Sequence, residues 1–209
     1  MAATTERQFV ITRNLWRLSR HYSVVTPHGD NLYYVERSVC RPGKADLTMH
    51  LGPDKTAPVA AVCHMPHLSG NLKIGLGDPS RPEAMQWEDM IKQTLTASEY
   101  QWAMTDLPQR RANLDPARTA PLRFAWKRTH SVAADGLSLW SLSTRNYKLI
   151  DLDTGQRAAV FTSDRTATRC GVLQIDATHG PDFDLMVIAT CLGLYEKAYR
   201  RSQSRGSGS

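Results

Sequence analysis

One segment of the chain carries two side chains that could together hold an anion. In the stretch from Phe124 to His130, Arg128 and His130 stand two positions apart, so on a strand they point to the same face. If Phe124 and Trp126 face a core, this pair lies at its rim. A guanidinium and an imidazole there could bind a phosphate or carboxylate, or serve an enzyme acting on a small molecule. The alternative to an anion site is that Arg128 pairs with a buried acid or with the carbonyls at a helix end.

The other face of the same segment is also basic. Arg123 and Lys127 point away from the expected core and could contact an acidic surface. The formal charge of +6 and the pI of about 9.3 are compatible with anionic lipid or nucleic acid, and also with an ordinary solvated basic face. The candidate residues for binding an anion or a lipid are therefore Arg123, Lys127, Arg128 and His130.

A second segment combines a thiol with imidazoles but predicts no metal site. Cys63, His64 and His67 lie close together, yet Cys63 and His64 are adjacent on an expected strand and point to opposite faces. No second ligand pair follows at zinc spacing. The glycines at 75 and 77 match no nucleotide-binding fingerprint. We expect no metal, no cofactor and no catalytic residue from these patterns.

Composition narrows the class of protein further. Several aromatic residues alternate with basic ones, but they lie on strands that need a core face, and no known nucleic-acid-binding motif is present, so nucleic acid is not an expected partner. No apolar signal sequence follows Met1. Four scattered cysteines predict free thiols and therefore a cytoplasmic protein: Cys40, Cys63, Cys170 and Cys191. The basic charge is compatible with peripheral association of such a protein with membranes.

Short strands separated by turns must position these residues. In the stretch 45–51, Leu47, Met49 and Leu51 alternate with polar side chains, which is typical of a strand with one buried face. Strands are expected at 8–12, 31–36, 45–51, 57–64, 71–76, 100–104, 122–130, 137–142, 147–152, 157–162 and 171–175, with a hairpin turn at 151–155. Such a series predicts an antiparallel barrel or sandwich.

The segment 84–92 is an exception to this pattern. Ala84, Trp87 and Ile91 recur at helical spacing, so periodicity alone predicts a short helix there.

The segment from Asp184 to Tyr195 has no polar face. A helix that is apolar all round must be surrounded by lipid or by its own protein. The apolar run of 11 residues from Leu185 to Tyr195 is too short for a membrane span, which needs about 20. We expect a helix near 182–201, with Asp182 as its N-cap, sheathed by the strands, and a flexible tail at 203–209. The residues that would fill the barrel are Leu185, Ile188, Cys191, Leu192 and Tyr195.

A closed barrel around an apolar C-terminal helix resembles the tubby C-terminal-like superfamily, which includes tubby, the phospholipid scramblases and the LURP-one-related proteins. Within it, the chain is most similar to the fungal tubby C-terminal-like proteins. The similar stretches are 45–52, 73–79, 124–130, 147–151 with 154–155, and 183–201. The resemblance implies an all-β fold of about 12 strands closed around the helix, a single domain over 5–202, and a strand rather than a helix around Trp87.

The resemblance also bears on function. Tubby proteins bind phosphoinositide headgroups, so it implies a non-catalytic binding or adaptor protein at anionic phospholipid surfaces, with a phosphoinositide or a small anionic molecule as ligand. Two alternatives stay open: an enzyme of fungal metabolism that uses Arg128 and His130 at a barrel mouth, and a scaffold for protein interactions. Because the helix would fill the lumen, a ligand is expected at a mouth or on the outer wall.

Overall fold

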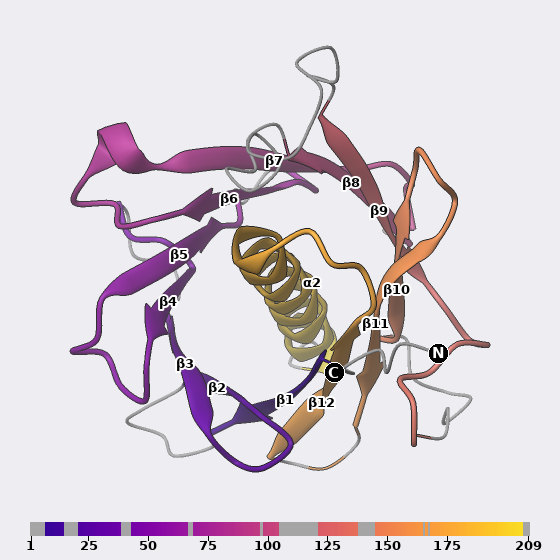
Figure 1. The fold of residues 1–209 in the computed structure, drawn as a ribbon, viewed down its shortest axis with the longest axis horizontal. Coiled ribbons are helices and arrows are strands. Elements are labelled where there is room, and N and C mark those ends of the chain that lie inside the picture. Colours follow the sequence, from indigo (N-terminus) through magenta and orange to yellow (C-terminus); the bar gives the residue numbers. More distant parts are fainter. Residues whose placement is uncertain are drawn as a thin grey trace.

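The computed structural model describes residues 7–14, 21–38, 43–66, 69–96, 98–104, 121–137, 145–164, 166 and 168–206. Within these ranges, twelve strands close into one antiparallel barrel, and the helix α2 (Pro181–Gly206) lies along its axis (Figure 1). The predicted fold class is therefore confirmed: an all-β barrel closed around a C-terminal helix.

The strands follow one another around the barrel in chain order, and β1 closes the ring by pairing with β12. Closure matters because it leaves none of these twelve strands with a free edge. The strands are β1 (Arg7–Arg13), β2 (His21–Val25), β3 (Asn31–Arg37), β4 (Leu47–Leu51), β5 (Val59–His64), β6 (Leu72–Leu76), β7 (Gln86–Lys92), β8 (Glu99–Met104), β9 (Leu122–Arg128), β10 (Tyr147–Asp151), β11 (Arg157–Ser163) and β12 (Arg169–Ile175).

Most expected strands are present, and the differences have physical causes. The periodicity prediction of a helix at 84–92 is wrong: the 3-10 turn η1 (Pro82–Ala84) is followed by strand β7. Trp87 and Ile91 are both exposed on the outer wall, while Met90 is buried. A spacing of four residues fits a strand face as well as a helix face, so it could not distinguish the two.

Two further strands differ from the expectation. β2 was not predicted, and the strand expected at 137–142 falls almost entirely outside the described residues.

Alternate residues of the strands point inward and form one core with the helix. On β9, Phe124 and Trp126 are fully buried. Trp126 donates its indole N–H to the Thr190 hydroxyl on α2 at 3.0 Å, and Thr190 in turn donates to the carbonyl of Met186 at 2.8 Å. The one polar side chain in the middle of the helix is thereby satisfied, and it links the helix to the barrel wall.

The residues expected to fill the barrel lie on the part of α2 that the barrel surrounds. Ile188, Cys191, Leu192 and Tyr195 are buried, and Leu185 is partly buried against the same core. Among the described residues, no helix is long and apolar enough to cross a membrane.

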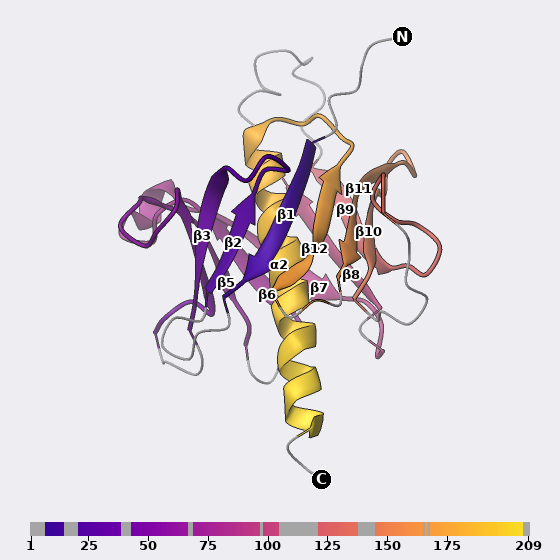
Figure 2. The same cartoon turned by 90° about the horizontal axis from the view of Figure 1, so that it is seen from below.

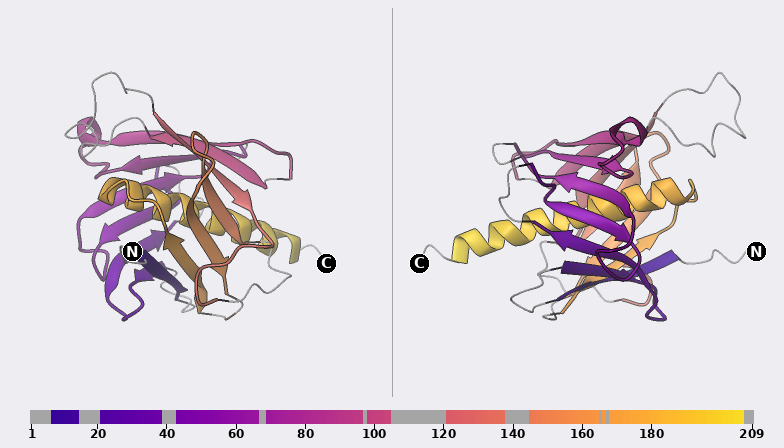
Figure 3. Two further views of the ribbon diagram at one scale, coloured as in Figure 1. Left: turned by 45° about the vertical axis from the view of Figure 1, so that its right-hand side comes forward. Right: turned by 90° about the vertical axis from the view of Figure 1, so that its left-hand side faces the viewer.

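The helix is longer than the sequence indicated at both ends. It begins at Pro181, directly after Gly180, whose φ of 98° turns the chain into the barrel. Asp182 therefore lies in the first turn rather than at the N-cap. At the other end the helix continues through Gly206 and emerges from the barrel (Figure 2; Figure 3).

The two ends of the barrel are distinguished by this helix. We term the end where α2 emerges the C-terminal mouth; β3, β7 and β9 end there, and β4, β8 and β10 begin there. The end where α2 begins is the N-terminal mouth.

Gly193 marks a close approach between α2 and the wall. A Cβ at this position would lie 2.8 Å from Cδ2 of Leu72 and 3.1 Å from Sγ of Cys63. We expect Gly193→Leu to lower the free energy of unfolding by about 1–3 kcal/mol, because the extra atoms overpack this contact. Urea denaturation measures the change. Ser204→Leu, on the exposed end of the same helix, should change stability by less than about 0.5 kcal/mol. Equal effects of the two substitutions would contradict the packing.

Candidate functional site

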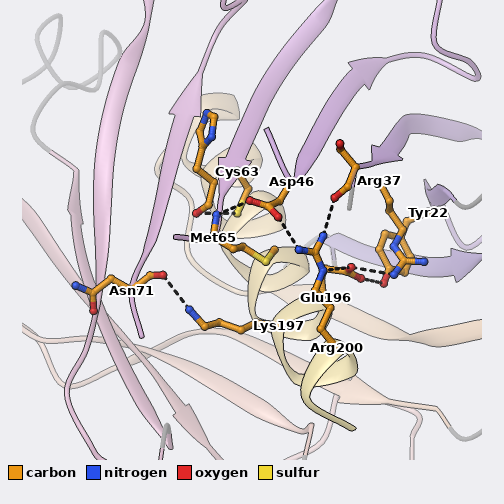
Figure 4. A network of polar contacts seen from close by, with 11 residues as sticks. Tyr22, Arg37, Asp46, Cys63, Met65, Asn71, Glu196, Lys197 and Arg200 are labelled. Atoms are coloured by element: carbon orange, nitrogen blue, oxygen red, sulfur yellow. Dashed lines mark hydrogen bonds and ion pairs between the residues drawn. The ribbon is translucent and has the colours of Figure 1, made fainter. Parts of the chain in front are cut away.

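A buried carboxylate anchors α2 at the C-terminal mouth. Glu196 has no exposed surface. One of its oxygens accepts hydrogen bonds from Arg37 at 2.8 Å and from Arg200 at 2.6 Å, and the other accepts one from the Tyr22 hydroxyl (Figure 4). A carboxylate can be buried here because both of its oxygens are engaged, by two cations and a hydroxyl.

The network extends from the helix to two loops at the same mouth, between β3 and β4 and between β5 and β6. Arg200 also binds the Asp46 carboxylate and donates to the carbonyl of Ser38 at 2.9 Å, and Asp46 accepts the backbone N–H of Met65 at 2.7 Å. The ammonium of Lys197 donates to three successive carbonyl oxygens, at 3.2, 2.7 and 2.9 Å: Ser69, Gly70 and Asn71. These contacts fix how far the helix lies within the barrel.

Burial and charge alter the pKa values in this network. Burial opposes ionisation of Glu196, but the hydrogen bonds and charge of Arg37, with Tyr22 and Arg200, outweigh it and lower the pKa of Glu196. Burial, followed by the charge of Arg201, lowers the pKa of Lys197 to about 8. Burial raises the pKa of Tyr22, so its hydroxyl remains a donor.

Glu196 predicts a pH-dependent component of stability. Its pKa in the folded protein lies below the ordinary value of 4.5, so the stability that it contributes is present above that value and is lost as the pH falls through the folded-state pKa. We expect Glu196→Gln to lower the free energy of unfolding by about 3 kcal/mol at neutral pH, because buried arginines lose their counter-charge. The deficit should shrink in acid.

Urea denaturation from pH 7 to pH 3 measures this difference. Glu36→Gln is the matched control, because Glu36 is an exposed carboxylate on the same strand as Arg37. A Glu196→Gln protein as stable as the unmodified one at neutral pH would contradict the anchoring role.

Beside this network, the C-terminal mouth contains a pocket of about 390 Å³. Its walls are formed by β8, β9 and β10, by the segments that precede β8 and β10, and by α2. None of the described residues that line it is acidic, and four are basic: Arg128, Arg145, Lys197 and Arg201. Hydroxyl groups line it as well, from Thr96, Tyr100, Tyr147 and Ser202. Cations and hydroxyl donors without a carboxylate are a suitable environment for an anion.

The four basic side chains come from three segments of the chain, and Lys197 and Arg201 share α2. Arg128 is the last residue of β9, and its Nε is buried without a hydrogen-bond partner among the described residues. Arg145 precedes β10; it donates to the Ser202 hydroxyl at 3.0 Å, and its guanidinium lies 5.5 Å from the ring centre of Tyr195. Arg201 follows Lys197 by one helical turn. Three separate segments thus bring positive charge to one cavity.

Tyr147 adds a hydrogen-bond donor to this pocket. Burial raises the pKa of Tyr147. Arg128 lowers it through its charge and through a hydrogen bond, but these two effects only partly offset the effect of burial. The hydroxyl therefore stays protonated at neutral pH. A bound anion would meet cationic donors and a neutral hydroxyl within one cavity, where salt screens charges less than it does on an open surface.

The structure separates the four residues predicted from the sequence. Arg123 lies at the other end of β9, at the N-terminal mouth, where it binds Asp153 at 2.6 Å. Lys127 lies on the outer wall, 3.5 Å from the carboxylate of Glu99. Only Arg128 lines the pocket.

The fourth candidate, His130, does not share the inward face with Arg128 as the alternation predicted. The strand ends at Arg128, and His130 lies exposed in the turn that follows. The imidazole is therefore outside the pocket lining.

Sequence reasoning missed the other members of the pocket. Lys197 and Arg201 were not predicted as site residues, although their spacing of four residues places them on one face of α2. Arg145 lies in no recognisable motif, and the pairing of β10 with β9 brings it to the same end of the barrel as Arg128. The burial of Glu196 was also missed, although Arg200 follows it at the same spacing of four.

The thiol and imidazole segment forms no metal site among the described residues, where no group of three potential ligands occurs. Cys63 is buried and His64 packs against Trp87 on the outer wall, so the two point to opposite faces as predicted. Burial raises the pKa of the Cys63 thiol, which makes it unreactive. Cys63, Cys170 and Cys191 are free, while Cys40 and His67 lie outside the described residues.

In comparisons with known proteins, no protein-family model matches this chain, and no curated protein matches it significantly. The fold and the basic pocket are therefore the grounds on which a function can be proposed.

Proposed function

We propose that this chain is a non-catalytic binding protein of the tubby C-terminal-like kind that engages anionic phospholipid surfaces. The observation that carries the proposal is the pocket at the C-terminal mouth, with four basic residues and no acidic residue among its described lining. The twelve-stranded barrel around a C-terminal helix is consistent with that family.

The size and position of the pocket support a headgroup as its ligand. Its volume of about 390 Å³ lies at the small end of the range for ligand pockets, about 300–1,000 Å³. It lies at a mouth because α2 occupies the lumen. Basic residues near an anionic membrane contribute about 1 kcal/mol each, so a few of them are sufficient for measurable association.

The chemistry of the pocket supports binding more than catalysis. Among its described lining residues there is no carboxylate, imidazole or thiol, the groups that most often act as general bases or nucleophiles. The enzyme alternative relied on His130, which lies outside this lining. An adaptor that holds an anionic group needs none of these groups.

Vesicle co-sedimentation tests the proposal. Unmodified protein should bind vesicles that contain phosphatidylserine or a phosphoinositide, and not pure phosphatidylcholine, with affinity falling as salt rises. Replacing Arg128 and Arg201 together by Gln should weaken binding by roughly 30-fold, because two lipid-facing charges are lost.

A second double variant has the same net charge but changes residues outside the pocket. Arg123→Gln with Lys127→Gln should bind nearly as well as the unmodified protein. Equal losses in the two variants would show that diffuse charge, not the pocket, governs association. No binding at low salt would refute the proposed function.

A further inference from the structure

The loop between β7 and β8, residues 93–98, carries the most exposed of the large apolar side chains that the structure describes. Leu95 is 98% exposed, whereas Ile91 on the adjoining strand is 40% exposed. Thr96, the next residue, lines the basic pocket. An apolar loop tip and a cluster of cations therefore lie side by side at the C-terminal mouth.

Hydroxyl groups of the described loop residues hydrogen-bond with one another and with the backbone. The Thr94 hydroxyl accepts the backbone N–H of Ser98 at 2.9 Å and that of Glu99 at 3.2 Å. The hydroxyls of Thr94 and Thr96 each lie 3.0 Å from that of Ser98. These bonds satisfy the loop internally and leave Leu95 projecting into solvent.

The loop is also tied to the strand that carries the pocket arginine. Arg128 donates its backbone N–H to the carbonyl of Ser98 at 2.8 Å, and Gln93 donates to the carbonyl of Glu99 at 2.9 Å. The position of Leu95 is thus fixed relative to Arg128. Whatever covers the loop tip must also come close to the pocket.

An anionic bilayer has the chemistry to meet both features together. Its phosphates lie outside its acyl chains, so a surface that binds it well presents cations beside a projecting apolar group. A single exposed leucine is ordinary on a protein surface. Here its neighbour Thr96 lines the pocket together with the four basic residues; the nearest charged residues in the chain are Lys92 and Glu99, and Glu99 lies 3.5 Å from the ammonium of Lys127. The charge complementarity favours lipid over a basic or neutral protein surface.

We propose that the β7–β8 loop is the membrane-inserting element of this protein. Leu95 enters the boundary between headgroups and acyl chains while Arg128 and Arg201 hold a headgroup phosphate in the pocket. The inference rests on the proposed function and adds to it the face that docks, the C-terminal mouth, and the residue that penetrates.

The opposite mouth supplies a matched control. Leu51 is the last residue of β4, at the N-terminal mouth, and is 58% exposed. Leu95→Ser and Leu51→Ser remove the same apolar group from opposite ends of the barrel. Neither side chain is buried, and thermal melting verifies that both variants remain folded.

Co-sedimentation with phosphatidylcholine–phosphatidylserine vesicles gives the first readout. Leu95→Ser should weaken binding about tenfold, the loss expected when one buried leucine is removed from an apolar environment, while Leu51→Ser leaves binding unchanged. If both variants bind as well as the unmodified protein, the docking face is wrong although lipid binding stands. If the unmodified protein does not bind, both proposals are overturned.

An environment-sensitive dye gives a second readout that does not depend on affinity. Leu95→Cys and Leu51→Cys, each in a Cys40→Ser background, are labelled with the fluorophore NBD; the buried thiols of Cys63, Cys170 and Cys191 should stay unlabelled. Anionic vesicles should shift the emission of the dye at 95 to the blue, and not that at 51. An unshifted dye at 95 on vesicle-bound protein would overturn the inference and point to a protein partner for the loop.

Discussion

The burial of α2 inside a closed barrel is the constraint on which the rest of this structure depends. A twelve-stranded barrel needs its lumen filled, and the helix needs its whole apolar circumference covered. Each requirement satisfies the other. Gly193 shows how close the fit is, because its missing side chain lets the helix backbone approach Leu72 and Cys63. Because α2 occupies the axis along this stretch, the described basic pocket lies at an end of the barrel.

The apolar fit alone would not fix how deep the helix lies. An apolar helix can slide along an apolar wall with little change in buried area, whereas Glu196 can be satisfied at only one depth. There it meets Arg37 from β3 and Tyr22 from β2, while Lys197 meets the carbonyls of the β5–β6 loop. A displacement of one helical turn would leave this carboxylate buried without its partners. The depth set in this way also brings Arg201 to the pocket.

The sequence predicted those parts of the fold that depend on local patterns. Alternation located most strands, and the apolar run after Asp184 located the helix, because both follow from burial at a fixed period. The sequence pattern wrongly predicted a helix at Trp87 and Ile91, because their spacing of four residues suits a strand face as well as a helix face. The pocket could not be predicted, since Arg128 and Arg145, at the ends of the paired strands β9 and β10, meet Lys197 and Arg201 only when the distant helix α2 lies inside the barrel. Burial of Glu196 was hidden because a charged residue ordinarily marks the end of a buried segment.

Besides the emerging helix, the pairing of charged side chains distinguishes the two ends of the barrel. At the N-terminal mouth the arginines meet carboxylates: Arg7 binds Asp184, Arg123 binds Asp153 and Arg157 binds Asp176. At the C-terminal mouth, Glu196 and Asp46 are occupied by Arg37 and Arg200, and the described pocket lining beside them has cations but no acid. The acids that hold the helix are thereby kept out of the pocket. These three arginines are thus paired within the fold, whereas the described lining of the pocket holds four basic residues and no acidic one.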